Sequence, residues 1–200
     1  MAFEGDGRRA CRGGRFYCRD SLAGQASFKK LSVGFSTRHI PDVEPEDYPR
    51  FMQAALREAE SAYDKGEVPV GAVVVFENRI IGRGHNLTTS MRDATAHAEI
   101  VALSAAYSHF KDWRLDNCVL VCTLEPCAMC AGAAVLSRIE RIVYGARDPK
   151  FGGCESIFNI PTERRLNHRI ELVSGVMEDE VAAMMQAFFR EVRAGKDKTN

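Results

Sequence analysis

The sequence predicts one α/β domain, folded as a three-layer α/β/α sandwich with a mixed five-stranded sheet. Segments with helical and with strand periodicity alternate from residue 47 onward, which is typical of this architecture. Residues 118–123 are apolar on both alternating faces, as expected for a strand covered by helices on both sides. A hairpin near residue 77 predicts an antiparallel pair, whereas helical crossovers between the later strands predict parallel pairs.

The first half of the domain contains a helix, a hairpin and a second helix. Apolar residues recur at i, i+3 and i+4 between Asp47 and Gly66, which predicts an amphipathic helix. Two strands follow at residues 68–76 and 79–83, separated by a two-residue turn. Residues 95–110 are rich in alanine and predict a helix, whose apolar face would hold Ala98, Val101, Ala102 and Ala105.

The second half continues this alternation after the apolar strand at residues 118–123. A helix is expected from Cys127 to about Arg138, and a strand at residues 141–144. A loop containing Gly and Pro leads to a strand at residues 169–173, and a last helix is expected from about Glu178 to Val192.

Composition excludes several classes of protein. Apolar residues make up 46% of the 200 residues, with 16 Gly and 7 Pro, which excludes collagen-like, low-complexity and wholly disordered chains. The longest uncharged, mostly apolar runs lie at residues 68–76 and 126–137. Both are shorter than the roughly 18 residues of a membrane-spanning helix, so we expect a globular protein that does not cross a membrane.

Charge and cysteine usage bear on partners and compartment. The formal net charge is +0, so a nucleic-acid partner has to be argued from a local patch. The 7 cysteines are an odd number and include one Cys-x-x-Cys motif. In a chain without a signal peptide, this favours metal or redox use over a disulfide framework. We therefore expect a cytoplasmic protein, with organelle targeting by residues 1–45 left open.

Residues 1–45 differ in texture from the rest of the chain. They lack apolar periodicity, and the first 40 residues hold 8 Lys and Arg against 3 Asp and Glu. This pattern predicts a disordered or weakly ordered N-terminal extension, followed by a folded domain over residues 46–200. The basic start resembles an organelle transit peptide, but Glu4 and Asp6 do not fit that pattern.

Two short motifs carry residue types that bind zinc. His97-Ala-Glu99 opens one predicted helix, and Pro126-Cys127-Ala-Met-Cys130 opens the next. A chance Pro-Cys-x-x-Cys is expected only roughly 0.01 times in such a chain. Cysteines at i and i+3 share a helix face, and the helix dipole stabilises thiolates there. His97, Cys127 and Cys130 therefore supply the three protein ligands of a catalytic zinc.

Glu99 is expected to act beside the metal and not on it. It lies two residues from His97, and side chains at i and i+2 do not face each other on a helix. From there it could exchange protons with water that zinc activates. This order of motifs, His-x-Glu followed by Pro-Cys-x-x-Cys, is typical of zinc-dependent deaminases of nucleobases.

Four stretches of the sequence extend these motifs. They are Thr-Ala-His-Ala-Glu-Ile at residues 95–100, Thr-Leu-Glu-Pro-Cys-Ala-Met-Cys-Ala-Gly at 123–132, Val-Tyr-Gly-Ala-Arg-Asp at 143–148 and Asn-His-Arg at 167–169. With these stretches the sequence resembles the tRNA-specific adenosine deaminase family, within the cytidine/deoxycytidylate deaminase fold. The resemblance covers about residues 47–195. The chain departs from the family in its N-terminal extension and in the loop after residue 148.

The resemblance implies an activity and a set of site residues. One zinc ion per chain would be bound by His97, Cys127 and Cys130, with Glu99 as the proton shuttle. Asn86 would hydrogen-bond the flipped base, and Asp148 would lie along the RNA path. The implied reaction is deamination of adenosine to inosine at the wobble position of a tRNA anticodon stem-loop, by a homodimer whose sites borrow residues from the partner.

Other interpretations of these residues remain open at this point. The cysteines could form a structural zinc site or a redox pair, in a non-catalytic zinc-stabilised subunit. The same metal site would also serve a deaminase of a free base or nucleotide. Asn86 and Asp148 could simply make turns, and Cys118 and Cys122 are interpreted as core residues.

An RNA contact is the least specific of these expectations. Residues 138–169 hold 7 Lys and Arg against 4 Asp and Glu, an excess that could face phosphates or simply be solvated surface. Phe151, Phe158 and His168 lie in the same stretch and could stack on unpaired bases, although Phe is equally typical of a core.

Overall fold

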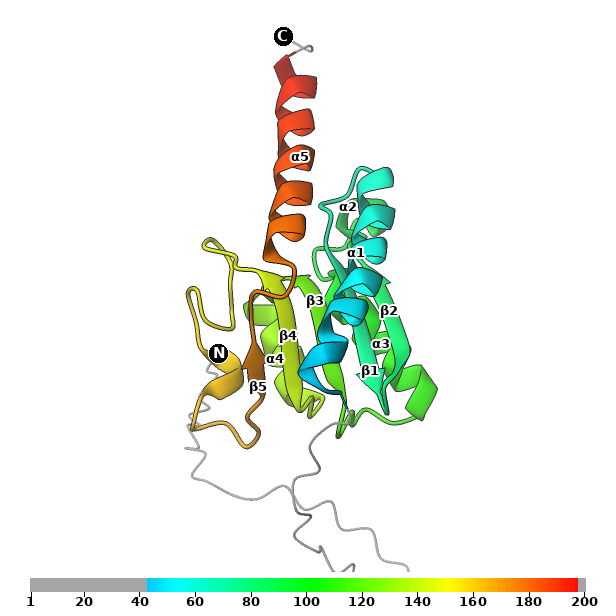
Figure 1. Cartoon of the computed structure of the whole chain (residues 1–200), viewed down its shortest axis with the longest axis vertical. Coiled ribbons are helices and arrows are strands. Elements are labelled where there is room, and N and C mark those ends of the chain that lie inside the picture. Colours follow the sequence, from blue (N-terminus) through cyan, green and yellow to red (C-terminus); the bar gives the residue numbers. More distant parts are fainter. Residues whose placement is uncertain (1–42, 198–200) are drawn as a thin grey trace, which may run out of the picture. The chain divides into compact units, whose positions relative to one another are not determined.

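A computed structural model of the chain describes residues 43–197 (Figure 1). Most of the expected N-terminal extension, residues 1–42, lies outside the described residues. Two 3-10 turns, Pro45–Asp47 and Ile160–Thr162, accompany ten helices and strands in this range. In chain order these are α1 Tyr48–Asp64, β1 Gly71–Phe76, β2 Arg79–His85, α2 Thr88–Met91, α3 Ala98–Phe110, β3 Val119–Leu124, α4 Ala128–Leu136, β4 Arg141–Ala146, β5 Glu171–Val173 and α5 Glu178–Asp197.

The five strands form one mixed sheet in the order β2-β1-β3-β4-β5. The β1 strand pairs antiparallel with β2 and with β3, whereas β3–β4 and β4–β5 are parallel pairs. The predicted mixed five-stranded sheet is thus confirmed. The parallel register pairs Leu124 with Ala146, so the segments that follow β3 and β4 leave the sheet side by side.

Helices cover the sheet on both faces, as the apolar strand at residues 118–123 predicts. Val119 and Val121 of β3 pack in a cluster with α1 and with Val181 of α5. Leu120 and Cys122 face the opposite cluster, which contains buried residues of α3 and α4. Figure 1 shows the same arrangement, with α1 and α5 on one side of the sheet and α3 and α4 on the other. Cys118 is also fully buried, so both cysteines of this strand region are core residues, as expected.

The sequence prediction is less accurate for the helix expected at residues 95–110, which corresponds to α3. The α3 helix begins at Ala98 and not at residue 95, because His97 still has extended backbone, with φ −78 and ψ 153. Its fully buried stripe is Ala98, Ala102 and Ala106, whereas Val101 and Ala105 are only half-buried. The reason is the close approach of β2, where a Cβ on Gly84 would lie 2.3 Å from the carbonyl oxygen of Ala98.

Helix α5 extends the domain at its carboxyl end. It runs to Asp197, five residues beyond the predicted end at Val192. Phe188 of α5 makes an edge-on contact with Tyr63 at the end of α1, with ring centroids 5.5 Å apart. Among residues 43–197, no helix is both long enough and apolar enough to span a bilayer.

Candidate metal centre and active site

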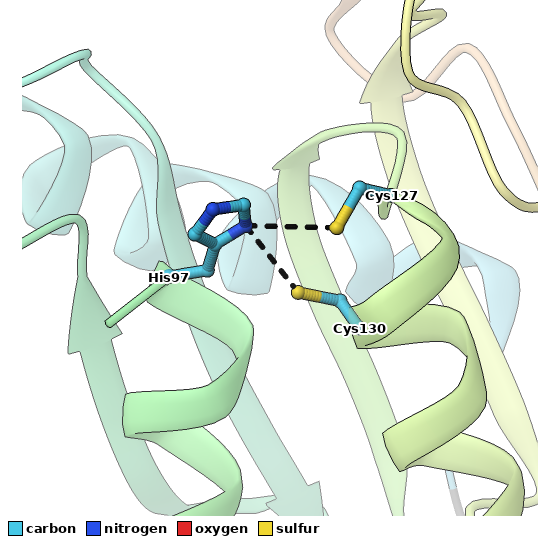
Figure 2. Close-up of side chains that lie close together, drawn as sticks. All are labelled: His97, Cys127 and Cys130. Carbon is cyan, nitrogen blue, oxygen red and sulfur yellow. Dashed lines mark hydrogen bonds between the residues drawn. The ribbon is translucent and has the colours of Figure 1, made fainter. Parts of the chain in front are cut away.

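The structure brings the three predicted metal ligands together at the starts of two helices. His97 is the N-cap of α3 and Cys127 the N-cap of α4, and Cys130 lies in the first turn of α4. The imidazole Nδ1 of His97 lies 3.6 Å from the Sγ atom of each cysteine. Figure 2 shows the imidazole directed at both sulfur atoms. The three ligand atoms lie within 4.8 Å of one another, so this group could hold a metal ion.

The geometry and the donor set fit zinc. Zinc bonds of about 2.3 Å to sulfur and about 2.0–2.1 Å to nitrogen in a tetrahedron place a sulfur and a nitrogen ligand about 3.5 Å apart. The observed separations of 3.6 Å match this value. One imidazole and two thiolates are also the ligands of a catalytic zinc that keeps a fourth position open.

Protonation within this group favours the binding of a cation. A hydrogen bond from Cys130, together with the nearby His97, lowers the pKa of the Cys127 thiol to about 4 against the effect of burial. The hydrogen bond with Cys127 raises the pKa of His97, while the bond to Cys127 and burial raise that of Cys130. Of the two cysteines, Cys127 is therefore the thiolate and Cys130 the thiol. A bound cation would displace the remaining protons of the group.

Glu99 lies in the first turn of α3 and is 3% exposed. Its Oε2 atom is buried and has no hydrogen-bond partner among residues 43–197. Burial raises the pKa of this carboxyl to about 7, with a further increase from the charge on Cys127. A buried carboxyl of this kind can hold or release a proton near neutral pH, which is the property that general acid–base chemistry requires.

Asn86 lies at the carboxyl end of β2 and is 7% exposed. Its backbone N–H donates to the carbonyl oxygen of Val70, at 3.1 Å. The N–H of Leu87 donates to the carbonyl oxygen of Ala96 at 3.0 Å, which closes the intervening segment into a loop. Asn86 and His97 therefore flank the same closed loop, although they are eleven positions apart in the printed sequence.

The α2 helix within this loop is held by a residue that the sequence did not indicate. Glu67 is 1% exposed, and its carboxylate accepts from the backbone N–H groups of Thr89 and Ser90 and from the hydroxyl of Thr88. Burial acts to raise the pKa of Glu67, but these hydrogen bonds outweigh it and lower the pKa to about 2. Neither α2 nor this contact was predicted.

Asp148 follows β4, and its side chain closes a turn, which is one of the interpretations left open by the sequence. Its Oδ1 atom accepts from the backbone N–H groups of Lys150 and Phe151, at 2.9 and 3.2 Å. Phe151 is 69% exposed and Phe158 is 51% exposed, so neither aromatic side chain is a core residue. His168 lies elsewhere, where its Nε2 atom is 2.6 Å from the carbonyl oxygen of Ile139.

Glu125 is a second functional candidate that sequence reasoning left without a role. It precedes Pro126 and is 2% exposed, and its carboxylate accepts hydrogen bonds from the segment between Asp148 and Ser156. Burial acts to raise its pKa, but hydrogen bonds led by those from Ser156 lower it. The only sequence signal was an acidic residue directly before the Pro-Cys-x-x-Cys motif.

Comparison with known proteins gives the family. A family model described as MafB19-like deaminase matches residues 46–193. The chain is 50% identical over 147 residues to the tRNA-specific adenosine deaminase of Bacillus subtilis (strain 168), covering 73% of this chain and 91% of that protein. The chain belongs to the tRNA-specific adenosine deaminase family.

Solved structures agree with membership of the tRNA-specific adenosine deaminase family. A structure from studies of A-to-I editing by tRNA:A34 deaminases matches with a TM-score of 0.65 and 43% identity, over 68% of this chain and 98% of that one. A guanine deaminase from Nitrosomonas europaea matches with a TM-score of 0.62 and 25% identity, over 70% of this chain and 83% of that one. The cytidine deaminase-like fold expected from the sequence is thereby confirmed.

Proposed function

We propose that the protein deaminates adenosine to inosine at the wobble position of a tRNA anticodon loop. The observation that carries this proposal is the joined group of His97, Cys127 and Cys130 beside the buried Glu99, in a chain of this family. Support for the substrate comes from the likeness to the Bacillus subtilis enzyme and to the structure from tRNA:A34 deaminase studies.

His97, Cys127 and Cys130 would hold one zinc ion per chain. When bound, zinc supplies the Lewis acidity that makes water a nucleophile at neutral pH. The fit of the 3.6 Å nitrogen–sulfur separations to a tetrahedral zinc site supports this assignment.

Glu99 would move the proton during the reaction. Water forms a bond to C6 of the adenine ring, the bond from C6 to the exocyclic nitrogen breaks, and ammonia leaves. Glu99 accepts the first proton of the water at Oε2 and gives it to the ring nitrogen. It then takes the proton of the new C6 hydroxyl and gives it to the departing amine, so that C6 becomes a carbonyl. The unpartnered, buried Oε2 atom supports this role.

Asn86 and Asp148 would contribute to substrate binding. Asn86, at the end of β2 on the loop that leads to His97, would hydrogen-bond the edge of the flipped base. Asp148 would lie along the RNA path, on the loop that also exposes Phe151. Both assignments are carried by the family pattern and by the position of the two residues on loops that adjoin the metal group.

A homodimer is proposed on the basis of the outer surface of α4. No charged residue occurs in Ala128–Leu136, and Met129 and Leu136 are 36% and 74% exposed. A Cβ on Gly132, between them, would meet no atom within 4 Å. An exposed apolar helix face of this kind is typical of a protein interface, and we take its partner to be a second copy of this chain.

Residues 46–200 would form the deaminase domain, since the family model matches 46–193. The preceding extension would be dispensable for the chemistry. Deletion of residues 1–42 is expected to leave inosine formation within about twofold of the full chain. A larger loss would contradict this division of the chain.

The main alternative is deamination of a free base. The observation in its favour is the structural similarity to the guanine deaminase of Nitrosomonas europaea, which is 25% identical to this chain. An anticodon stem-loop with adenosine at the first anticodon position should be compared with free adenosine, guanine and cytidine, at equal concentration and fixed salt. We expect product from the stem-loop far in excess of the others, because flanking nucleotides add binding energy that positions the base. Faster turnover of a free base would overturn the proposal.

A further inference from the structure

We propose that Glu125 is a positioning residue that holds the loop at residues 148–156 against the start of α4 for RNA binding. The proposal rests on the proposed function for its substrate. Glu125 lies between the end of β3 and Cys127, and it is buried, with 2% of its surface exposed. It is therefore no candidate for direct contact with RNA, and its effect would pass through the loop.

The carboxylate of Glu125 accepts five hydrogen bonds from this one loop. Oε1 accepts from the backbone N–H groups of Cys154, Glu155 and Ser156, at 3.2, 2.8 and 2.9 Å. Oε2 accepts from the backbone N–H of Asp148 at 3.0 Å and from the hydroxyl of Ser156. The two ends of the loop thus converge on one side chain, which has no Lys, Arg or His ion-pair partner among the described residues.

Further contacts join the loop to the metal group. The N–H of Gly153 donates to the carbonyl oxygen of Pro126 at 2.7 Å, and Gly152 forms an isolated antiparallel bridge with Cys127. A Cβ on Gly152 would lie 2.5 Å from Cδ of Glu125, and one on Gly153 would lie 2.7 Å from the carbonyl carbon of Cys127. The two glycines therefore let the loop backbone pack directly on Glu125 and on the backbone of a metal ligand.

The opposite side of the loop is open to solvent. Lys150 is exposed and Phe151 is 69% exposed, on the turn that Asp148 closes. A cation and an aromatic ring in this position suit a phosphate and an unpaired base of single-stranded RNA. Because a loop fixed at both ends loses less conformational freedom on binding, Glu125 would increase RNA affinity without touching the RNA.

Glu125→Gln tests this role with little change in shape. The glutamine keeps one oxygen for the three N–H groups at residues 154–156, but its NH2 group cannot accept from the N–H of Asp148. We expect faster hydrogen–deuterium exchange across residues 148–156, an unchanged zinc content, and a KM for the stem-loop raised about tenfold, with kcat changed less than threefold. Ser156→Ala, which removes a single hydroxyl donor, should shift KM and exchange in the same direction by less.

Glu163→Gln is the matched control. Glu163 lies in the same connection between β4 and β5, and its carboxylate accepts from the backbone N–H and the guanidinium of Arg165 and not from residues 148–156. Its substitution should leave KM and exchange at residues 148–156 unchanged. Unchanged exchange or unchanged KM in Glu125→Gln would overturn the proposal, as would loss of zinc, which would indicate an effect on the metal group instead. The exchange measurement needs no substrate, so it tests the hold on the loop even if the stem-loop proves not to be a substrate.

Discussion

Glu99 is the residue at which burial and chemistry conflict most directly. A buried polar atom without a hydrogen-bond partner costs free energy of folding, on the order of 1–3 kcal/mol, and Oε2 of Glu99 is such an atom. A carboxyl that served only the fold would find a donor, as Glu67 and Glu125 do. The unpaired oxygen beside the metal group supports the proposed use of Glu99 in proton transfer.

Replacement of Glu99 by glutamine should separate this role from metal binding. Glu99→Gln is expected to retain one zinc per chain and to lose roughly 100- to 10,000-fold in kcat, the contribution typical of general acid–base groups. Cys130→Ser is the control, because it removes a proposed ligand and should lose most of the zinc. Elemental analysis and inosine formation are the two measurements. A Glu99→Gln protein without zinc would make Glu99 a ligand.

Glu67 should make the stability of the protein depend on pH in the acid range. Its pKa is lowered from 4.5 to about 2 in the folded state, so the folded form prefers the ionised carboxylate. The resulting stabilisation is fully present above about pH 5 and is lost as the pH falls toward 2, amounting to at most about 3 kcal/mol.

Denaturant unfolding of Glu67→Gln between pH 7 and pH 3 checks this assignment. The variant should be less stable than the unsubstituted protein at pH 7, and the difference should shrink at pH 3 as the native Glu67 loses its advantage. A difference in the free energy of unfolding that stays constant over this range would show that Glu67 contributes through packing alone.

At the scale of elements, the sequence predicts those helices, strands and motifs that have a characteristic pattern of residue types. It does not predict contacts that depend on backbone groups. The Pro-Cys-x-x-Cys spacing and the apolar strand at residues 118–123 are local patterns, and both lead to the metal group and the layered fold. The contacts of Glu67 and Glu125 are made to backbone N–H groups more than 20 residues away. Any residue type supplies such a donor, so neither α2 nor the held loop at residues 148–156 left a pattern to recognise.

The contact between β2 and α3 depends on a glycine in the same way. A Cβ on Gly84 would lie 2.3 Å from the carbonyl oxygen of Ala98 and 2.5 Å from the amide nitrogen of Ala102. Gly84→Ala should therefore force the helix away from the sheet and lower the free energy of unfolding by about 1–3 kcal/mol or more. Because α3 carries His97 and Glu99 at its start, activity should fall as well.

Gly195→Ala is the matched control for this effect. Gly195 lies within α5, where an added Cβ meets nothing within 4 Å. Alanine has the higher helix propensity, so this variant should be unchanged or more stable by up to about 1 kcal/mol. Urea unfolding of both variants decides the point, and equal stabilities would show that the β2–α3 contact tolerates an additional carbon.

At the scale of the whole molecule, α4 covers one face of the sheet but has apolar side chains on its inner and its outer side. Its inner side packs in the core through Cys130, Ala131 and Ala134, whereas its outer side exposes Met129 and Leu136. The N-cap of the same helix is Cys127, a proposed metal ligand. A second copy seated on this surface would therefore lie close enough to the metal group for one chain to complete the other's site.

Leu136→Glu should disrupt this proposed dimer, because it places a charge on the exposed apolar face of α4, and burial of an unpaired charge in an interface is costly. We expect the unsubstituted chain of 22.2 kDa to scatter light as a particle of about twice that mass, and Leu136→Glu to scatter as a monomer with much reduced inosine formation. Met91→Glu, at an exposed methionine of α2, is the control and should keep the dimer mass. If the unsubstituted protein is monomeric at micromolar concentration while fully active, the outer face of α4 has another partner and each site is complete within one chain.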